Sequence, residues 1–307
     1  MIGRHVVKLL ADAQAEVTVV SLDKIHPDPR AEYLYADLTN YEACKSICRQ
    51  KNFVFHLAGV KASMQISTTM VASHFVPTMM MNTNVLEACR IHNVERVLYT
   101  SSIGAYEADS NYYEKELGVF DGPPLDFAGW AKRMGELQIA AYQKQFGMRN
   151  FCVVRPSAVY GPGDNFDPAT AMVVPSLLAK IKTGEVVEVW GDGKAVRDIA
   201  FSEDIAEGII MALIKGTDGY VNLGSGLGIT IRKLVETMQK IVPFKFTFDP
   251  TKPSGKKEKL LDLEKARKIL SYQPRTSLKE GLAKTWEWFL QHGEEHTQKM
   301  NYFKERN

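Results

Sequence analysis

Residues 16–23 read Glu16-Val17-Thr18-Val19-Val20-Ser21-Leu22-Asp23, a short apolar run that ends in an acid. Such a run is typical of a buried strand in a parallel sheet. The residues before it, Gly3-Arg4-His5-Val6-Val7-Lys8-Leu9-Leu10, have the pattern of an opening helix. A helix that leads into a buried strand is the second part of a βαβ unit, which begins with a strand and a Gly-rich turn. We therefore expect the first strand of this unit to be missing and Gly3 to be the last glycine of its turn.

Strand and helix patterns alternate along the rest of the chain. Strand patterns fall at 53–57, 96–100, 151–155 and 219–223, and helical patterns fall at 41–49, 80–92 and 130–146. This alternation predicts an α/β fold with a Rossmann-like, doubly wound parallel sheet. Gly- and Pro-rich loops become frequent after Gly161. We therefore predict a first domain at 1–160, whose sheet is completed by about 197–225, and a smaller interleaved lobe made of 161–196 and 226–307.

Composition excludes several functional classes. In 307 residues, 38 Lys and Arg nearly balance 36 Asp and Glu, and no long basic run with interleaved aromatic residues indicates a nucleic-acid partner. No apolar run approaches the roughly 18 residues of a membrane helix, and no signal peptide is apparent. The four cysteines are few for this length, and their spacing favours reduced thiols over disulfides or a metal site. We predict a cytoplasmic protein that binds no nucleic acid, membrane or metal.

A set of short motifs carries a resemblance over almost the whole chain, through their order and spacing. They are Tyr35-Ala36-Asp37-Leu38, His56-Leu57-Ala58-Gly59, Thr100-Ser101-Ser102, the helix that contains Lys132, Arg155-Pro156-Ser157-Ala158-Val159-Tyr160-Gly161-Pro162, Trp190-Gly191-Asp192-Gly193, Arg197-Asp198 and Asn222-Leu223-Gly224-Ser225-Gly226. The chain resembles the extended short-chain dehydrogenase/reductases, in the NAD-dependent epimerase/dehydratase family. Within that family it is most similar to nucleotide-sugar epimerases and to the GDP-fucose synthase group.

The resemblance implies a dinucleotide cofactor, NAD, with NADP left open. Gly3 would let the free N–H groups of a helix N-terminus approach the pyrophosphate. Asp23 lies 20 residues further on, about where an acid binds the adenosine ribose. Ser21 competes for that place and would tolerate a 2′-phosphate better, so the cofactor form stays open. The other implied cofactor residues lie at or near strand ends: Asp37, Leu38, Leu57, Ala58, Gly59, Lys61, Lys132, Pro156 and Ser157.

The catalytic helix of the family carries Tyr-Gly-x-x-Lys, and here the Tyr position is Ala128 while Lys132 is in place. Residues four apart share a helix face, so an ammonium can lower the pKa of the phenol from about 10 towards neutrality and make it a general base. A methyl group cannot move a proton. The resemblance therefore implies catalytic positions at Ser102, Ala128 and Lys132, with the base absent. Ser102 would hydrogen-bond the sugar oxygen at the reacting carbon.

The resemblance also implies substrate contacts in the second lobe. Asn165, Arg197, Lys256 and Lys257 correspond to positions that hold a nucleotide diphosphate, where cationic donors pair with phosphate oxygens. Glu258 occupies the place of the usual arginine in this stretch, so the neighbouring lysines would supply the charge. Surface lysines without a role are the alternative interpretation.

Several catalytic side chains of the family are absent, and their absence rules out some of the reactions that the resemblance implies. Ile103 and Met172 stand where the GDP-fucose synthase group has the Cys and His of 3,5-epimerisation, and neither can exchange a proton. The acidic pair of the 4,6-dehydratases has no counterpart after Ser102. Hydride transfer at one carbon remains, of the C4 epimerase or C4 dehydrogenase type, with a GDP-sugar as one candidate substrate.

Three alternatives stay open at this point. The first is a non-catalytic relative that binds a nucleotide sugar or a dinucleotide, and the second is a GDP-sugar epimerase-reductase. The third is a redox sensor or scaffold, because a fold alone does not fix function. The helices at 80–92 and 130–146 resemble the family's dimer helices, so we also predict a homodimer.

Overall fold

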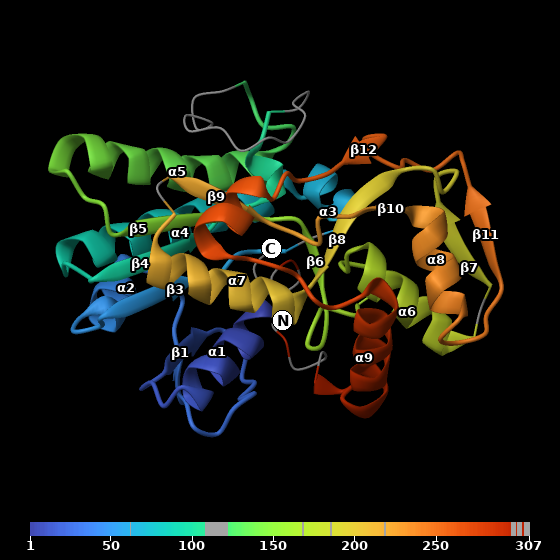
Figure 1. Ribbon diagram of the computed structural model, residues 1–307, viewed down its shortest axis with the longest axis horizontal. Helices are drawn as coiled ribbons and strands as arrows, with labels where there is room; N and C mark the ends of the chain where they lie inside the picture. Colours follow the sequence, from blue (N-terminus) through green and yellow to red (C-terminus); the bar gives the residue numbers. More distant parts are fainter. Residues whose placement is uncertain are drawn as a thin grey trace.

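The computed structural model describes residues 1–61, 63–107, 122–167, 169–184, 186–217, 219–295, 299 and 303. The chain forms two lobes (Figure 1). Each lobe has its own buried apolar core. The larger core lies around a parallel sheet. The smaller core lies in the second lobe, where the rings of Phe166 and Phe289 stack 4.1 Å apart.

The main sheet has four parallel strands in the order β3-β4-β5-β9. Each is a short apolar segment, and all six residues of β5 are buried because helices cover both faces of the sheet. The predicted doubly wound α/β fold is confirmed, and each of the four predicted strands matches within one or two residues. The strands are β3 (Phe53–His56), β4 (Arg96–Thr100), β5 (Phe151–Pro156) and β9 (Tyr220–Leu223).

A separate parallel pair precedes the main sheet. Strands β1 (Thr18–Ser21) and β2 (Glu32–Tyr35) pair with each other, and among the described residues no strand joins β1 to β3. The helix α1 (Ile2–Asp12) leads into β1 as predicted. The strand β2 was not predicted, because three of its four side chains are exposed and its sequence carries no buried run.

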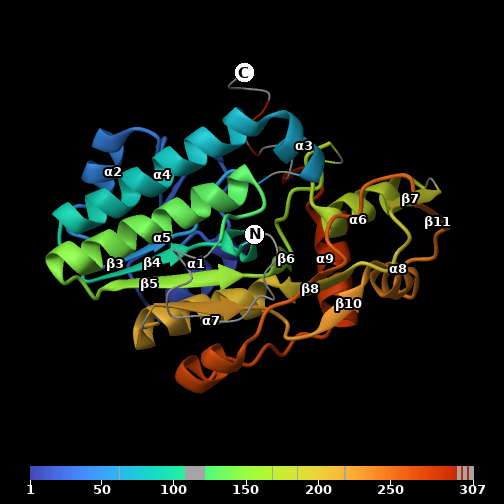
Figure 2. The same ribbon diagram turned by 90° about the horizontal axis from the view of Figure 1, so that it is seen from above.

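Helices cover both faces of the main sheet (Figure 2). On one face α4 packs between α2 and α5, and on the other α7 packs against α1 and β5. The predicted helices 80–92 and 130–146 both begin earlier than expected. Pro77 lies inside α4 and is buried. Because proline usually ends or interrupts a helix, the sequence pattern predicted a start after this residue. The helices are α2 (Tyr41–Cys48), α3 (Met64–Thr69), α4 (Val71–Ile91), α5 (Phe127–Phe146) and α7 (Ser202–Lys215).

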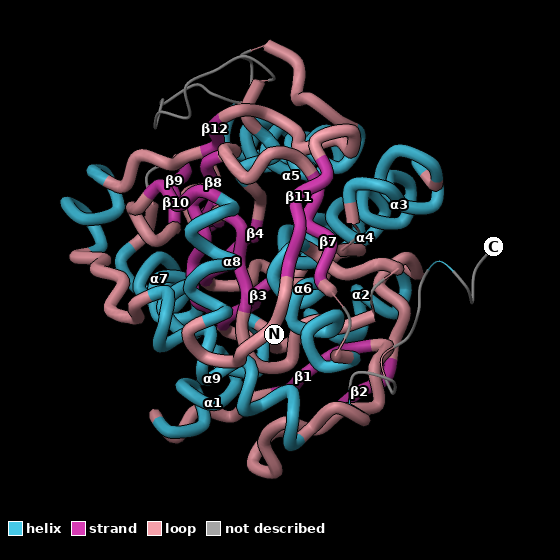
Figure 3. Tube along the Cα trace, turned by 90° about the vertical axis from the view of Figure 1, so that its right-hand side faces the viewer, coloured by secondary structure: helices cyan, strands magenta, loops and turns pink. Residues whose placement is uncertain are grey.

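The second lobe holds short strands and helices (Figure 3), which surround the smaller core. Its larger sheet has β8 at the centre, flanked by β6, β10 and β12. Residues 197–201 thus lie in this sheet, whereas 220–223 complete the main sheet. The elements are β6 (Ala158–Tyr160), β8 (Val196–Phe201), β10 (Gly228–Thr230), β12 (Glu258–Lys259), the pair β7 (Val187–Trp190) and β11 (Phe246–Asp249), and the helices α6 (Val173–Thr183), α8 (Ile231–Gln239) and α9 (Leu278–Gln291). Two further short elements are the 3₁₀ helix η1 (Ile103–Ala105) and the π-helix η3 (Ala266–Leu270).

All four cysteines are buried, and none of them forms a disulfide in the structure. The described part of the chain contains no cluster of side chains suited to hold a metal ion. None of its described helices is both long and apolar enough to cross a bilayer.

Candidate functional site

The start of α5 lies directly against the turn that follows β4. Asp126 caps the helix by accepting a hydrogen bond from the Gly129 N–H at 2.8 Å. A Cβ on Gly129 would lie 2.1 Å from the Gly104 carbonyl oxygen, so only glycine permits this approach. Further along α5, the buried Arg133 donates to the Ala105 carbonyl from Nε at 2.7 Å. The helix and the η1 turn are therefore held together where the motif residues lie.

Lys132 reaches from α5 to the carboxyl end of β4. Its Nζ donates to the Thr100 carbonyl oxygen at 2.8 Å, and a Cβ on Gly59, beyond the end of β3, would lie 3.4 Å from the same nitrogen. Burial lowers the pKa of Lys132 to about 8, although Glu136 opposes the shift. Its two other N–H donors have no partner among the described residues, so they can bind an oxygen of a ligand.

Ser102 follows Thr100 by two residues, and Ala128 precedes Lys132 by four. The Ser102 Oγ accepts a hydrogen bond from the Gly104 N–H at 3.0 Å, which orients the hydroxyl at the end of β4. Ala128 is half-buried, one helical turn before Lys132. The structure thus brings the three predicted catalytic positions to the same strand ends.

The lowered pKa of Lys132 has a testable consequence for stability. An unfolded lysine titrates near 10.5. Between pH 8 and 10.5 the unfolded chain therefore binds more protons at this site than the folded chain, and stability rises with pH, by up to about 1.4 kcal/mol per pH unit. Below pH 8 the folded chain bears the full free-energy cost of burying the charged Lys132 ammonium. Urea unfolding at pH 7 to 10 should show that the free energy of unfolding of the unaltered chain increases with pH relative to that of Lys132→Met. Parallel pH curves for the two proteins would contradict the buried position of the amine.

A buried ion pair fixes α5 onto β5. Arg155 contacts Glu136 through Nε at 2.9 Å and Nη2 at 2.5 Å, and the two side chains are 0% and 1% exposed. The guanidinium lies over the Tyr220 ring, 3.6 Å from its centroid. Ser101 donates to the same carboxylate at 2.5 Å. Because Glu136 is one helical turn after Lys132, the pair also sets the position of the Lys132 side chain.

A cavity of about 1660 Å³ extends along β1 and β3, past their carboxyl ends, and on towards the second lobe. Asp37 lies at its margin, where its carboxylate accepts from the Thr39 N–H at 2.9 Å and so closes a turn. Ser157 follows Pro156 at the end of β5, buried beside Asp198. The predicted cofactor residues that line the cavity are Gly3, Asp23, Leu38, Leu57, Ala58, Gly59 and Lys61.

Cations gather where α1 begins. Burial, followed by the nearby charges of Lys299, Arg4 and Lys61, lowers the pKa of the Met1 amine to about 5, and Asp164 opposes the shift. Lys61 itself pairs with Asp164 at 2.8 Å, a contact that bridges the two lobes. Lys299, Arg4 and Asp164 were not predicted, because they come together only through contacts between segments far apart in the sequence. The arrangement is suited to an anion at the helix N-terminus.

A second group of cations comes from the other lobe. Lys259 and Arg197 are register partners on adjacent strands β12 and β8. Burial lowers the pKa of Lys259, and Arg197 and Lys256 add to the shift while Asp126 opposes it. Asp126 caps α5, so this group faces the helix that carries Ala128 and Lys132.

The structure separates the predicted substrate residues. Arg197 is in the cationic group and donates to the Ser254 carbonyl at 2.7 Å, and Lys256 lies close to Lys259. Lys257 is exposed. Asn165 uses its amide within its own loop, where Nδ2 donates to Thr170 at 2.8 Å. The sequence pattern predicted substrate contacts at Lys256 and Lys257. In the structure, the alternation of side chains along β12 exposes Glu258 and turns Lys259 inwards.

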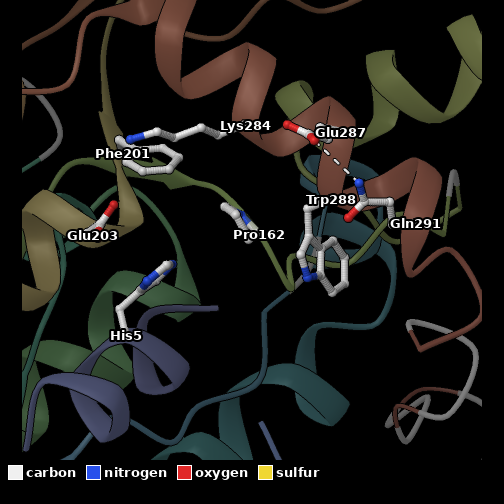
Figure 4. A pocket seen from close by; sticks show the side chains of 8 residues that line it. All are labelled: His5, Pro162, Phe201, Glu203, Lys284, Glu287, Trp288 and Gln291. Carbon is white, nitrogen blue, oxygen red and sulfur yellow. Dashed lines mark hydrogen bonds between the residues drawn. The ribbon is translucent and has the colours of Figure 1, made fainter. Parts of the chain in front are cut away.

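A smaller pocket of about 240 Å³ lies where α1 meets α9 (Figure 4). The side chains of His5, Lys284 and Trp288 surround it together with Phe201. Burial lowers the pKa of His5 to about 4, and nearby cations add to the shift. Of the motif residues, Pro162 lines this pocket, but Ser102, Ala128 and Lys132 do not. We therefore place the candidate site at the strand ends.

Known proteins resemble this chain in sequence and in structure. The model of the NAD dependent epimerase/dehydratase family matches residues 1–224. A GDP-L-fucose synthase of Sinorhizobium fredii is 31% identical over 303 residues, which cover 94% of this chain and 92% of that protein. The GDP-L-fucose synthase of Escherichia coli is 30% identical over 257 residues, which cover 77% and 79% of the two chains.

A solved structure gives the same result. The UDP-glucose 4-epimerase of Thermotoga maritima, determined with UDP-glucose, superposes with a TM-score of 0.85 and 26% identity, covering 95% of this chain and 96% of that one. The match to the family model over most of the chain, together with the Lys132 helix and the parallel sheet, confirms the resemblance. The chain belongs to the NAD-dependent epimerase/dehydratase family.

Proposed function

We propose that this chain catalyses reversible NAD(P)-dependent hydride transfer at C4 of a nucleotide-diphosphate sugar, as a C4 epimerase or C4 dehydrogenase does. The observation that carries the proposal is the position of Lys132, whose Nζ is held 2.8 Å from the Thr100 carbonyl at the strand ends beside Ser102 and Gly59. In doubly wound sheets, ligands bind in the crevice at the carboxyl ends of the strands.

The residues at the strand ends fit a bound dinucleotide. The N-terminus of α1 and the cations Arg4, Lys61 and Lys299 suit a pyrophosphate. The cavity beside them is lined by Leu57, Ala58 and Gly59, which leave the backbone accessible. The spare donors of Lys132 suit ribose hydroxyls. A dinucleotide held there would supply hydride-transfer chemistry at the sugar carbon.

The chain's own residues then have distinct tasks. Ser102 presents its hydroxyl to the sugar oxygen at the reacting carbon, and Lys132 binds the nicotinamide ribose. Arg197, Lys256 and Lys259 pair with the diphosphate of the sugar nucleotide. No side chain at position 128 can take the proton, so we expect binding without fast turnover.

We further propose that the cofactor is NAD rather than NADP. The Ser21 hydroxyl accepts a hydrogen bond from the Asp23 N–H at 3.0 Å, while the Asp23 carboxylate stands at the cavity and would repel a 2′-phosphate. Fluorescence titration should show tighter binding of NADH than of NADPH. Asp23→Asn should reduce the preference by about tenfold, because it removes one like charge at close range. Equal affinities in the unaltered chain would contradict this assignment.

The similarity to GDP-L-fucose synthases supports a GDP-sugar as substrate, and it supports a GDP-sugar epimerase-reductase as a less favoured alternative. Two positions argue against the latter reaction. Ile103 is buried in η1, and Met172 precedes α6, so neither place offers a group that exchanges a proton. The second candidate function is a non-catalytic nucleotide-sugar or dinucleotide-binding protein, which Ala128 favours. Turnover of the Ala128→Tyr variant separates the enzyme from the binder.

We also propose a homodimer through α4 and α5, which lie side by side (Figure 2). Both helices expose apolar side chains one turn apart, Val76 and Met80 on α4 and Trp130 and Met134 on α5. Sedimentation velocity at micromolar concentration should show a dimer, and Trp130→Glu should give a monomer. Ile214→Glu, at a 64% exposed position on α7, is the matched control and should leave the dimer intact. A monomer for the unaltered chain would contradict the proposal.

A further inference from the structure

Two thiols meet in the core where α2 packs against α4 (Figure 2). Cys48 is the last residue of α2, and Cys89 lies in the last turn of α4. The Cys89 Sγ donates a hydrogen bond to the Cys48 Sγ at 3.8 Å, although the two residues are 41 positions apart in the sequence. Their side chains are 3% and 0% exposed. Helix packing alone therefore holds two buried sulfur atoms side by side.

This arrangement is close to that of a disulfide. An S–S bond is about 2.05 Å long, so the two sulfur atoms must approach each other by about 1.8 Å. The helix α2 has only eight residues, and Cys48 is at its C-terminal end. Helix ends fray, so a small shift of this end can supply the approach. The bond therefore requires no rearrangement of the sheet.

Cys48 is the thiol that reacts first. The hydrogen bond from Cys89 lowers the pKa of Cys48, while burial opposes the shift. The same hydrogen bond, followed by burial, raises the pKa of Cys89, and burial raises the pKa of Cys44 to about 12. The thiolate is the reactive form of cysteine. Cys48 also lines the cavity of about 1660 Å³, which gives a small oxidant access to its sulfur.

We propose that Cys48 and Cys89 form a reversible disulfide that ties α2 to α4 when the protein reacts with hydrogen peroxide. The Cys48 thiolate attacks one peroxide oxygen and the O–O bond breaks, which leaves a sulfenic acid on Cys48 and releases hydroxide. The hydroxide combines with the proton that Cys48 lost. The Cys89 sulfur then attacks the Cys48 sulfur, the S–O bond breaks, and the hydroxyl group leaves with the Cys89 proton as water. Two thiols are oxidised and one peroxide is reduced to two waters.

The tied helices support a turn beside the cavity. One turn before Cys48, the Cys44 thiol donates to the Leu38 carbonyl oxygen at 3.3 Å. From α4, the Asn84 Nδ2 donates to the same oxygen at 3.1 Å. Leu38 lines the cavity. The disulfide therefore joins the two helices that hold Leu38 in place.

The test treats the folded, reduced protein with a small excess of hydrogen peroxide and then removes the oxidant. The number of thiols, counted after denaturation, should fall from four to two. Digestion without reductant should give one peptide pair, which joins Cys48 to Cys89, and dithiothreitol should restore all four thiols. The Tm of the oxidised protein should rise by about 5 °C, because the cross-link restricts the unfolded chain.

Three variants provide the controls. Cys48→Ser should keep its three remaining thiols and show no rise in Tm, and any effect of oxidised methionine appears in this variant too. Cys44→Ser is the matched control, because it removes a thiol one turn away on the same helix, and it should still form the bond. In Cys89→Ser, a dimedone probe should label a sulfenic acid at Cys48.

Several outcomes would overturn the proposal. They are an unchanged thiol count in the folded chain, a disulfide that joins a different pair, and a Cys48–Cys89 bond that forms only in urea. A covalent dimer on a gel without reductant would place the bond between two chains and would also contradict it. A Tm that does not rise when the bond is present would contradict the tie between α2 and α4. Peptide mapping of the unaltered chain decides the pairing even if a serine variant does not fold.

This inference does not depend on the proposed function, because the proposed hydride transfer uses no cysteine. The thiol count, the peptide map and the Tm are all measured without dinucleotide or sugar nucleotide. The disulfide can therefore be established or rejected in a protein that binds neither.

Discussion

Ala128→Tyr should raise kcat with a sugar nucleotide by about 10²- to 10⁴-fold at saturating dinucleotide, because a positioned general base contributes about this much. The new phenol would lie one helical turn before Lys132, whose Nζ is fixed by the Thr100 carbonyl. An ammonium in that place stabilises the phenolate. Most of the gain should appear in kcat rather than KM, since the base acts in the transition state. Two rates are measured with GDP- and UDP-sugars. Cofactor reduction reports a dehydrogenase, and formation of the C4 epimer reports an epimerase, because an epimerase returns the hydride to the sugar.

Ala128→Phe is the matched control, because it adds the ring without the hydroxyl and should give no gain. Equal kcat for the unaltered chain and Ala128→Tyr would assign the base to another residue. Tyr112 and Tyr113, the candidates in the segment after Ser102, lie outside the described residues. No turnover in Ala128→Tyr, with nucleotide-sugar binding intact, would favour the non-catalytic alternative.

Arg155→Met should destabilise the folded chain by about 3–5 kcal/mol, because it leaves the Glu136 carboxylate buried without its charge partner. The native pair is 0% and 1% exposed, so water cannot compensate for the lost contact. Urea denaturation measures the change in the free energy of unfolding. The variant should also bind the dinucleotide more weakly. Lys132 lies one turn before Glu136, so a displacement of α5 would move this proposed cofactor contact.

Two further variants test the cause of this effect. Arg155→Met combined with Glu136→Leu removes both charges and should recover most of the lost stability. Lys284→Met breaks an exposed pair with Glu280 and should cost about 1 kcal/mol or less. A loss below about 1 kcal/mol in Arg155→Met would contradict the view that this pair holds α5 in place.

The strands of the main sheet were predictable because each is a local signal. β5 is a continuous apolar run, buried at every position, and the sequence alone predicted it within one residue. The short strands of the second lobe were not predicted. β12 has two residues, and it exists only because Val196 and Arg197 of β8 lie beside it. Pairing between distant segments, rather than local propensity, forms such elements.

The candidate site also combines residues that local sequence patterns predict with residues that only contacts between distant segments bring together. Ser102, Ala128 and Lys132 lie within motifs of fixed spacing, and the structure brings them to the same strand ends. Lys259 and Asp126 meet across more than a hundred residues of chain, and Lys61 meets Asp164 across 103. No local pattern records such contacts. Glu258 stands where the resemblance implies an arginine, and only the strand shows that the neighbouring Lys259 faces inwards.

The most direct test of the account is a calorimetric titration of the unaltered chain with GDP-L-fucose and with UDP-glucose in the presence of NADH. The account predicts saturable one-to-one binding of a nucleotide sugar. It also predicts affinity that falls at least about tenfold in Arg197→Met, because a guanidinium that pairs with phosphate is lost. Saturable binding that Arg197→Met leaves unchanged, or no saturable heat with either nucleotide sugar, would contradict the proposal that this chain holds its substrate between the two lobes.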